Sequence, residues 1–427
     1  MGGGLMQLVA YGAQDIYLTG NPQITFFKVV YRRHTNFSME AIKQTFNGTV
    51  GTSESSITCT VSRNGDLVSK LWLDVAFPAG SATGTTYCNW TNNLGHALVK
   101  ECELEIGGQR IDRHYSQWLD IWNELSDHDK SEYLGLGKSS AKNAYLKNTA
   151  SGLNLPARRT YVPLQFWFCR NVGLALPLIA LQYHEVKLKL TTRATAALVN
   201  ASAGGANPAV TAPTVEVWAD YIYLDTDERR RFAQVSHEYL IEQVQREEQA
   251  GTASLNMKLN YNHPVKELIW VVQTDAVAAE TPTFGTNADA TANNSSDAAN
   301  GNDYFNYQTS SGTSEWIKGV ESKESFGTCK LQLNGHDRFT ERNASYFRLC
   351  QPLQAGHKVP EKHVYCYSFA LKPEEHQPSG TCNFSRIDNA KLIFTTCAAT
   401  STTVTCWAVN YNVLRIMSGM GGLAYSN

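Results

Sequence analysis

Three short motifs in the chain resemble parts of known ligand-binding or catalytic sites. Gly135-Leu136-Gly137-Lys138-Ser139 resembles the end of a phosphate-binding loop, but Glu132 stands where that loop requires its first glycine. His184-Glu185 and His237-Glu238 begin like the zinc-binding H-E-x-x-H motif. Leu188 and Ile241 replace the second histidine in these two places, so neither can bind zinc in that way.

The remaining titratable residues form no catalytic pattern either. None of the 11 histidines lies two positions from another, which excludes the H-x-H metal pair of cupin enzymes, and no G-x-S-x-G elbow occurs. The 10 cysteines contain no C-x-x-C pair, and we expect them to be buried, reduced thiols. We therefore expect no catalytic residue, no metal, no cofactor and no enzymatic activity.

Two arginine runs are the strongest local charges. Arg229-Arg230-Arg231 and Arg32-Arg33 could contact phosphate, but Asp225, Asp227 and Glu228 directly precede the first run. The whole chain has 37 basic and 39 acidic residues among 427, a formal charge of -2. Proteins that wrap nucleic acid are strongly basic. We expect these arginines to form pairs between domains or subunits, and no direct contact with nucleic acid.

Alternating apolar and polar residues predict a mostly β protein. From Leu98, the side chains of Cys102, Leu104 and Ile106 point to one face, and the glutamates between them point to the other, until Gly107-Gly108 ends the strand. The same pattern predicts eight further strands: Leu67 to Phe77, Tyr183 to Thr192, Val215 to Leu224, Val265 to Thr274, Cys329 to Leu333, His363 to Leu371, Lys391 to Thr396 and Val404 to Ile416.

Helices and long loops lie between these strands. One amphipathic helix is predicted over Asp112 to Leu125, and a second begins at Asp225-Thr226, where acidic residues precede basic ones as the helix dipole favours. Ala194 to Pro213 and Ala276 to Gly312 have no apolar period and predict long surface loops.

No segment predicts secretion or a membrane span. The start of the chain lacks the basic and apolar regions of a signal peptide, and Met6 excludes a myristoylation motif. The longest apolar run, Val172 to Leu181, is far shorter than the roughly 20 residues of a membrane helix and contains Pro177. We expect a soluble protein that is made in the cytosol.

The chain contains an ordered internal repeat. Glu103 to Gly108 is similar to Lys330 to Gly335, and in both copies a helix-prone segment follows, over Asp112 to Leu125 and Asp337 to Leu349. Lys187 to Thr192 is similar to Lys391 to Thr396. The pair Trp218-Ala219 returns as Trp407-Ala408. Three matches in the same order predict two copies of a β-sandwich of roughly 190 residues, for which the jelly roll is the common large form.

Two longer strings resemble a known family. Leu8–Phe37 reads LVAYGAQDIYLTGNPQITFFKVVYRRHTNF, and Tyr223–Ala233 reads YLDTDERRRFA. Both resemble the major capsid proteins of nucleocytoplasmic large DNA viruses, and most closely those of the algal phycodnaviruses, including the Chlorella viruses. The resemblance covers essentially the whole chain.

The resemblance implies an all-β double jelly roll, two tandem eight-stranded sandwiches with a few short helices. The expected organisation is an arm over residues 1–24, a first jelly roll over 25–224, a connector helix over 225–236 and a second jelly roll over 237–427. The resemblance also implies a homotrimer that forms pseudo-hexameric capsomers of an icosahedral virion assembled in the host cytoplasm. The arm would lie at the capsomer base, near minor capsid proteins and the inner membrane, and residues 276–312 would form an outer loop.

Proteins of this family from Chlorella viruses carry Asn-linked glycans that virus-encoded enzymes add, often outside standard sequons. Asn287, Asn293, Asn294 and Asn302 are the candidate glycosylation sites that this resemblance suggests. Eight standard sequons also occur, at Asn36, Asn47, Asn89, Asn200, Asn293, Asn294, Asn343 and Asn383.

Two functions remain open from the sequence, beside an enzyme of the metal-free, glycan-active jelly-roll type, for which no residue can be named. The first is a major capsid subunit that acts through geometry alone. The second is a minor capsid or spike paralogue that uses the same double jelly roll to bind carbohydrate. The number of copies in each virion separates them.

Overall fold

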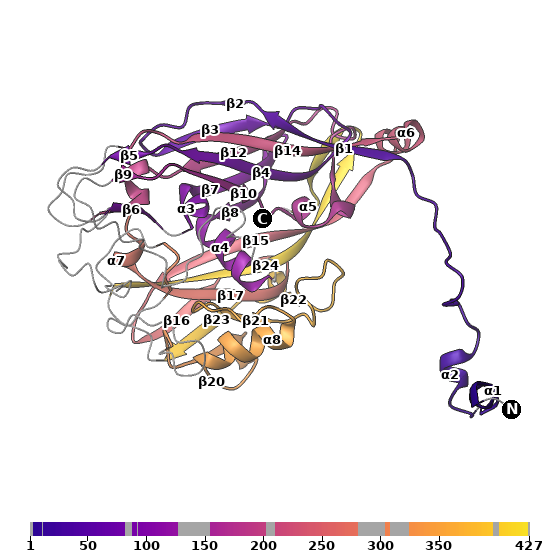
Figure 1. Ribbon diagram of the computed structural model, residues 1–427. Coiled ribbons are helices and arrows are strands. Elements are labelled where there is room, and N and C mark those ends of the chain that lie inside the picture. Colours follow the sequence, from indigo (N-terminus) through magenta and orange to yellow (C-terminus); the bar gives the residue numbers. More distant parts are fainter. Residues whose placement is uncertain are drawn as a thin grey trace. The chain divides into compact units, whose positions relative to one another are not determined.

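The computed structural model describes residues 3–10, 12–81, 88–91, 93–126, 154–201, 210–280, 304–307, 324–395 and 401–425. The chain divides into two compact units, Met1–Phe37 and Ser38–Asn427. Figure 1 shows the course of the chain and its elements.

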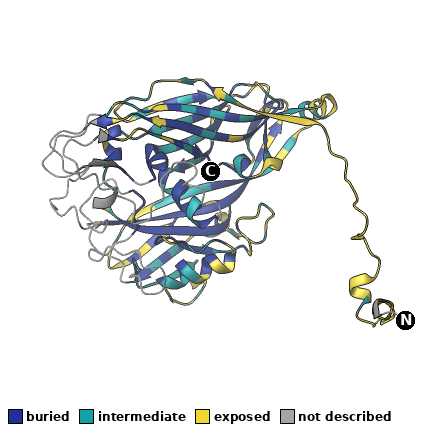
Figure 2. Cartoon of the chain, in the orientation of Figure 1, coloured by how far each residue is buried: buried dark blue, intermediate teal, exposed yellow. Residues whose placement is uncertain are grey.

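The first unit is an arm with two short helices, α1 (Gly3–Val9) and α2 (Ile16–Thr19). The carboxylate of Asp15 accepts a hydrogen bond from the backbone N–H of Gly12 at 2.7 Å, which fixes the turn before α2. Most of the arm is exposed (Figure 2), including large apolar side chains such as Tyr17, Phe26 and Phe27. Exposed apolar surface of this extent is typical of a segment that binds a partner.

The second unit begins with a sandwich of two antiparallel sheets. The strand order in one sheet is β1-β14-β4-β10, with β11 also paired to β4, and the order in the other is β2-β3-β12-β7-β8. The strands are β1 (Phe37–Gln44), β2 (Phe46–Asn47), β3 (Ser55–Thr60), β4 (Leu67–Phe77), β7 (Val99–Ile106), β8 (Gln109–Tyr115), β10 (Arg158–Pro163), β11 (Leu176–Pro177), β12 (Val186–Thr192) and β14 (Thr214–Leu224).

Smaller elements lie between these strands. Two short ladders join β5 (Gly80–Ser81) to β9 (Asn154–Leu155) and β6 (Cys88–Trp90) to β13 (Val199–Ala201). The helices are α3 (Leu94–Leu98), α4 (Ser116–Leu125) and α5 (Trp167–Arg170), with two 3₁₀ turns, η1 (Val172–Leu174) and η2 (Thr195–Leu198).

A second sandwich follows α6 (Thr226–Gln234). The strand order in its first sheet is β15-β24-β17-β21, with β22 paired to β17 and β25 to β24, and the order in its second sheet is β16-β23-β18-β19, with β20 paired to β18. The strands are β15 (His237–Ala250), β16 (Ser254–Leu259), β17 (Pro264–Thr274), β18 (Thr328–Leu333), β19 (His336–Asp337), β20 (Arg342–Asn343), β21 (Tyr365–Ser368), β22 (Cys382–Asn383), β23 (Ala390–Thr395), β24 (Thr402–Met417) and β25 (Met420–Leu423). The helices are α7 (Asp275–Ala278), a π-helical turn η3 (Tyr346–Cys350), α8 (Gln351–Ala355) and a 3₁₀ turn η4 (Phe384–Arg386).

The two sandwiches have the same topology, which confirms the repeat. β1-β14-β4-β10 corresponds to β15-β24-β17-β21, and β3-β12-β7-β8 corresponds to β16-β23-β18-β19. The three sequence matches fall on corresponding strands, β7 with β18, β12 with β23, and β14 with β24. Eight strands in the order of a jelly roll therefore occur twice, and the predicted double jelly roll is confirmed.

The prediction for the first helix is wrong at its start. α4 begins at Ser116, because Asp112 to Tyr115 complete β8 and pair with β7, Tyr115 opposite Glu101. The prediction for the second copy is also wrong over most of Asp337 to Leu349. Asp337 ends β19, residues 342 and 343 form β20, and the helical residues run from Tyr346 to Ala355. In both places the residues pair with the strand that precedes them in the chain, β8 with β7 and β19 and β20 with β18, and this pairing overrides the local helical pattern.

The two low-complexity stretches contain ordered structure that the sequence pattern missed. Within Ala194 to Pro213, η2 and β13 are ordered, and Leu198 and Val199 are buried. Within Ala276 to Gly312, Tyr304, Phe305 and Tyr307 are buried in the core of the first sandwich. Three aromatic side chains within four residues were the available signal. Residues 281–303 lie outside the described part.

Most described residues of the predicted strands lie in the strands of the structure, although boundaries differ by up to three residues. No helix in the described part of the chain is long and apolar enough to cross a membrane.

Candidate assembly surfaces

The junction between the two sandwiches is built on one sheet of the second. Leu268, Trp270 and Val272 of β17 point into the core of the second sandwich, whereas Ile269 and Val271 join the core cluster of the first. All five side chains are fully buried. A strand that is covered on both faces reads as a continuous apolar run, which explains the sequence Leu-Ile-Trp-Val-Val.

Strand β8 and helix α4 of the first sandwich cover this sheet. The backbone N–H of Val244 donates to the Asp112 carboxylate at 3.2 Å, and the side chain of Gln117 donates to that of Gln273 at 2.7 Å. The backbone N–H of Lys358 donates to the carbonyl of Leu125 at the end of α4, at 2.8 Å. Hydrogen bonds from side chains and backbone along the whole junction set the register of the two sandwiches.

A buried ion pair lies in the middle of the junction. The Lys362 ammonium, from the second sandwich, lies 2.7 Å from both carboxylate oxygens of Asp120 in α4. Asn93 and Tyr307 also donate to this carboxylate, at 2.5 and 3.1 Å. Four donated hydrogen bonds compensate the cost of removing the carboxylate from water.

Two further buried clusters contain histidine or lysine. His357 lies between Glu267, at 2.9 Å from its Nε2, and Glu374, at 2.6 Å from its Nδ1. Burial alone would lower the pKa of His357, but the two carboxylates raise it to about 9. The ring of Trp122 from α4 contacts His357 edge-on, so this cluster also borders the junction.

Glu242 on β15 holds the second cluster together. Its carboxylate lies 2.7 Å from the Lys266 ammonium and 3.0 Å from the Arg170 guanidinium, which belongs to the first sandwich. Burial would raise the pKa of Glu242, but the hydrogen bond from His376 and the charges of Lys266 and Arg170 lower it to about 2. These carboxylates have cationic partners and serve as structural charges.

The histidines of the two H-E motifs, His184 and His237, contact backbone carbonyl groups. His184 lies before β12, and its ring contacts the backbone carbonyl of Gly421 in the C-terminal hairpin at 2.9 Å. His237 begins β15, and its Nε2 contacts the carbonyl of Phe232 at 2.8 Å. Among the residues that the structure describes, no group of three or more His, Cys, Asp or Glu residues could hold a metal ion. Residues 135–139 lie outside the described part.

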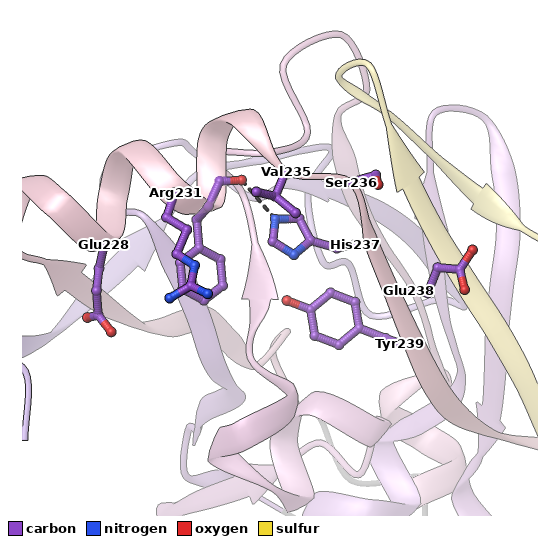
Figure 3. A pocket seen from close by; sticks show the side chains of 8 residues that line it. Glu228, Arg231, Val235, Ser236, His237, Glu238 and Tyr239 are labelled. Carbon is purple, nitrogen blue, oxygen red and sulfur yellow. Dashed lines mark hydrogen bonds between the residues drawn. The ribbon is translucent and has the colours of Figure 1, made fainter.

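The predicted arginine pairing is found for one residue of the run. Arg229 lies in α6, and its Nε is 3.0 Å from the carboxylate of Asp66 in the first sandwich. Arg231 lines a shallow pocket of about 460 Å³ between α6 and the start of β15 (Figure 3). The rings of Phe232 and Tyr239 each stack with the His237 ring there, and these contacts hold the turn that leads into the second sandwich.

The sheet β1-β14-β4-β10 of the first sandwich corresponds to the sheet of the second sandwich that lies at the junction. Its outer face is half exposed. Trp72 of β4 and Trp218 of β14 stack with ring centroids 5.6 Å apart, and Tyr161 of β10 lies 5.9 Å from Trp72. Asp220 accepts a hydrogen bond from the Trp72 indole at 3.2 Å. We call these four residues the aromatic face; beside it lies a pocket of about 720 Å³.

The candidate glycosylation sites Asn287, Asn293, Asn294 and Asn302 lie outside the described residues. Four of the standard sequons are in the described part with exposed asparagines: Asn36, Asn47, Asn343 and Asn383. Of the cysteines, Cys59, Cys102, Cys329, Cys366 and Cys406 are buried free thiols, Cys169 and Cys382 are partly buried, and Cys350 is exposed.

Comparisons with known proteins agree with this architecture. Residues 25–225 match the family described as major capsid protein N-terminus, and residues 228–422 match the large eukaryotic DNA virus major capsid protein family. The chain is 49% identical to the major capsid protein of Pyramimonas orientalis virus and 45% identical to that of Paramecium bursaria Chlorella virus 1, and each alignment covers both chains completely.

Solved structures show the same fold. The chain superimposes on the capsid protein of the PBCV-1 virus capsid with a TM-score of 0.73 at 39% identity, over 94% of this chain and 100% of that one. The Faustovirus major capsid protein has the same fold at 13% identity, with a TM-score of 0.74 over 95% of this chain and 94% of that one. The chain therefore belongs to the major capsid protein family of large eukaryotic DNA viruses, whose role is structural and whose place is the capsid of the virion.

Proposed function

We propose that three copies of this chain form a capsomer with a pseudo-hexagonal outline, and that these capsomers tile an icosahedral shell. The observation that carries the proposal is the internal repeat, because three chains with two equivalent sandwiches each bring six similar bodies together. The rigid junction around Asp120 and Lys362 keeps the two sandwiches of a chain in one orientation. A fixed orientation is what a regular lattice requires of its subunit.

The proposed organisation is an arm over residues 1–24, a first jelly roll over 25–224, a connector over 225–236 and a second jelly roll over 237–427. The two family matches meet between residues 225 and 228, which supports a connector at this place. The exposed apolar side chains of the arm support a role in binding minor capsid proteins and the inner membrane side.

The two ends of the sandwiches differ. Strands β5, β6 and β9 and helix α7 lie at the end opposite α6 (Figure 1). We assign the α6 end to the capsomer base and the other end, with the loop over residues 276–312, to the outer surface of the virion. Asn287, Asn293, Asn294 and Asn302 are then the proposed glycosylation sites. A glycopeptide mass map that finds all four unmodified would remove them.

The proposed mechanism is geometric and needs no catalysis, no cofactor and no direct contact with nucleic acid, and assembly takes place in the host cytoplasm. Light scattering coupled to size exclusion should give a trimer for the purified chain, and electron micrographs should show a pseudo-hexagonal outline. A chain that stays monomeric at every concentration and salt would contradict the proposal. Thousands of copies in each virion are expected, whereas a few tens would favour the minor or spike paralogue.

A further inference from the structure

The carboxylate of Asp120 holds a lysine amine and an asparagine amide on the same oxygen atom. Its Oδ1 accepts from the Lys362 ammonium at 2.7 Å and from the side-chain amide of Asn93 at 2.5 Å. Asn93 precedes α3 in the first sandwich, whereas Lys362 belongs to the second. All three residues are at most 4% exposed. A nucleophilic group and an amide group from the two halves of the chain are therefore neighbours in a closed site.

The surroundings of this site exclude water. The ring centres of Phe305 and Tyr307, both buried, lie 5.5 and 5.9 Å from the Lys362 ammonium. Where water is excluded, an amine and a carboxylic acid are favoured over two separate charges, so a proton can move from Nζ to Oδ1. The Asp120 carboxylate has its donors, but the buried Oδ1 of Asn93 has none among the residues that the structure describes.

We propose that Lys362 and Asn93 form a covalent isopeptide bond between the two sandwiches, with Asp120 as the proton carrier. The ion pair is the state before the reaction. After its proton has moved to Asp120, Nζ of Lys362 attacks Cγ of Asn93. The Nζ–Cγ bond forms, the Cγ–Nδ2 bond breaks, and Nδ2 leaves as ammonia. Of the two protons that Nζ loses, one passes through Asp120 to Nδ2 and one stays on the Asp120 carboxyl group. No oxidant, reductant or further reactant is needed.

The product satisfies the groups that the ion pair leaves unsatisfied. It contains no buried charge, and the protonated Asp120 can donate to the carbonyl oxygen of the former Asn93 amide. The hydroxyl of Tyr307 donates to the other oxygen of Asp120 at 3.1 Å, which leaves Oδ1 as the oxygen shared by the two reacting groups. Asp120 itself is the poorer target for the amine, because the negative charge of a carboxylate repels a nucleophile, whereas the amide carbonyl is neutral.

A second buried lysine provides an internal comparison. The ammonium of Lys266 lies 2.7 Å from Glu242 and is fully buried. The other partners of Glu242 in the described part of the chain are Arg170 and His376, and neither carries an amide carbon that an amine could attack. Lys266 should therefore stay unmodified.

The bond forms once in each chain and acts on no other molecule, so it goes beyond the proposed function and does not depend on it. It closes a covalent loop from residue 93 to residue 362. Such a link restricts the unfolded chain and holds the two sandwiches together when other contacts of the junction break.

Mass spectrometry of the purified full chain, incubated in its folded state, tests the proposal. We expect an intact mass lower than the sequence mass by one ammonia, and a tryptic digest that contains a branched peptide joining Lys362 to Asn93. The branched peptide is decisive, because ring closure at an Asn-Gly pair such as Asn47-Gly48 also releases ammonia. Lys266 should appear only in linear peptides. Linear peptides alone for Lys362 and Asn93 would overturn the proposal, and so would a link from Lys362 to Asp120 with the loss of water.

Two variants separate the reaction from the ion pair. Asp120→Asn keeps the shape of the side chain but removes the proton carrier, so the link should form at least about a hundredfold more slowly. Lys362→Arg keeps the cation without the amine and should give no branched peptide. Lys372→Arg is the control, since it changes an exposed lysine in the same way and should link as the wild type does.

Circular dichroism verifies the fold of each variant. A folded Asp120→Asn chain that forms the link at the wild-type rate would overturn the proposal. If a variant does not fold, the digest of the wild-type chain decides alone.

Discussion

The ammonium group of Lys362 lies 2.7 Å from both carboxylate oxygens of Asp120, and the two residues come from different sandwiches. Both side chains are almost completely buried. The loss of stability on removing this pair therefore reports how much it contributes to the junction between the two sandwiches.

We expect Lys362→Met to lower the free energy of unfolding by about 3–5 kcal/mol, because it leaves the Asp120 charge buried without its cation. Urea denaturation measures the loss. Lys372→Met is the matched control, since Lys372 pairs with Glu375 on the surface with side chains 66% and 57% exposed. That variant should lose less than about 1 kcal/mol. Similar losses in the two variants would contradict the structural role of the buried pair.

The histidine between Glu267 and Glu374 should make stability depend on pH in the alkaline range. The pKa of His357 is raised to about 9 in the folded chain from an ordinary value of 6.5. Its contribution, on the order of 3 kcal/mol, is complete below pH 6.5 and is lost as the pH rises through 9. Unfolding free energies measured from pH 6 to 10 should fall more steeply in the wild type than in His357→Gln. Parallel curves would argue against a charged His357.

The Glu242 cluster should act at the opposite end of the pH scale. The pKa of Glu242 is lowered from 4.5 to about 2, so its contribution of about 3 kcal/mol is complete above pH 4.5 and is lost as the pH falls through 2. Glu242→Gln should be less stable than the wild type at pH 7, and the difference should shrink in acid. A urea series from pH 2 to 6 tests this, with Glu375→Gln as the exposed control. A constant difference across the series would refute the assignment.

The C-terminal hairpin should depend on the absence of a side chain at Gly421. A β-carbon there would lie 2.5 Å from the Cδ2 of Leu181 in the first sandwich. Gly421→Ala should therefore cost about 1–3 kcal/mol and speed hydrogen exchange at the Tyr183 amide, which donates to the Gly419 carbonyl. Gly422→Ala is the control, because its β-carbon would contact only the end of the Gln109 side chain, at 3.1 Å from its Oε1. Equal exchange rates in the two variants would contradict the contact.

The arm should become ordered on assembly. We expect residues 1–24 to exchange their amide hydrogens rapidly in the free trimer, because the arm has few internal hydrogen bonds and its apolar side chains are exposed. Protection should appear in assembled capsids. Hydrogen-exchange mass spectrometry of both samples measures this, and equal protection before and after assembly would count against it.

Local sequence patterns predicted the strands in which buried and exposed side chains alternate. β4 begins and ends at Leu67 and Phe77, as predicted, because one face of it is completely buried and the other is partly exposed. The start of α4 was missed, since Asp112 to Tyr115 pair with the predicted strand β7 across the turn at Gly107-Gly108, whereas the apolar residues after Asp112 also fit a helical period. Asp120 and Lys362 are 242 residues apart, and only the folded chain brings them together. The sequence repeat predicted the two sandwiches but not which of their faces meet.

The uneven faces of the two sandwiches also bear on the order of events at the ribosome. The sheet that contains Ile269 and Trp407 carries apolar side chains on both faces and would aggregate if it were left uncovered. The elements that cover it, β8 and α4, precede it in the chain by more than a hundred residues. During synthesis from the N-terminus, β8 and α4 are therefore made first. The sheet with apolar side chains on both faces then emerges beside a first sandwich that can already be folded.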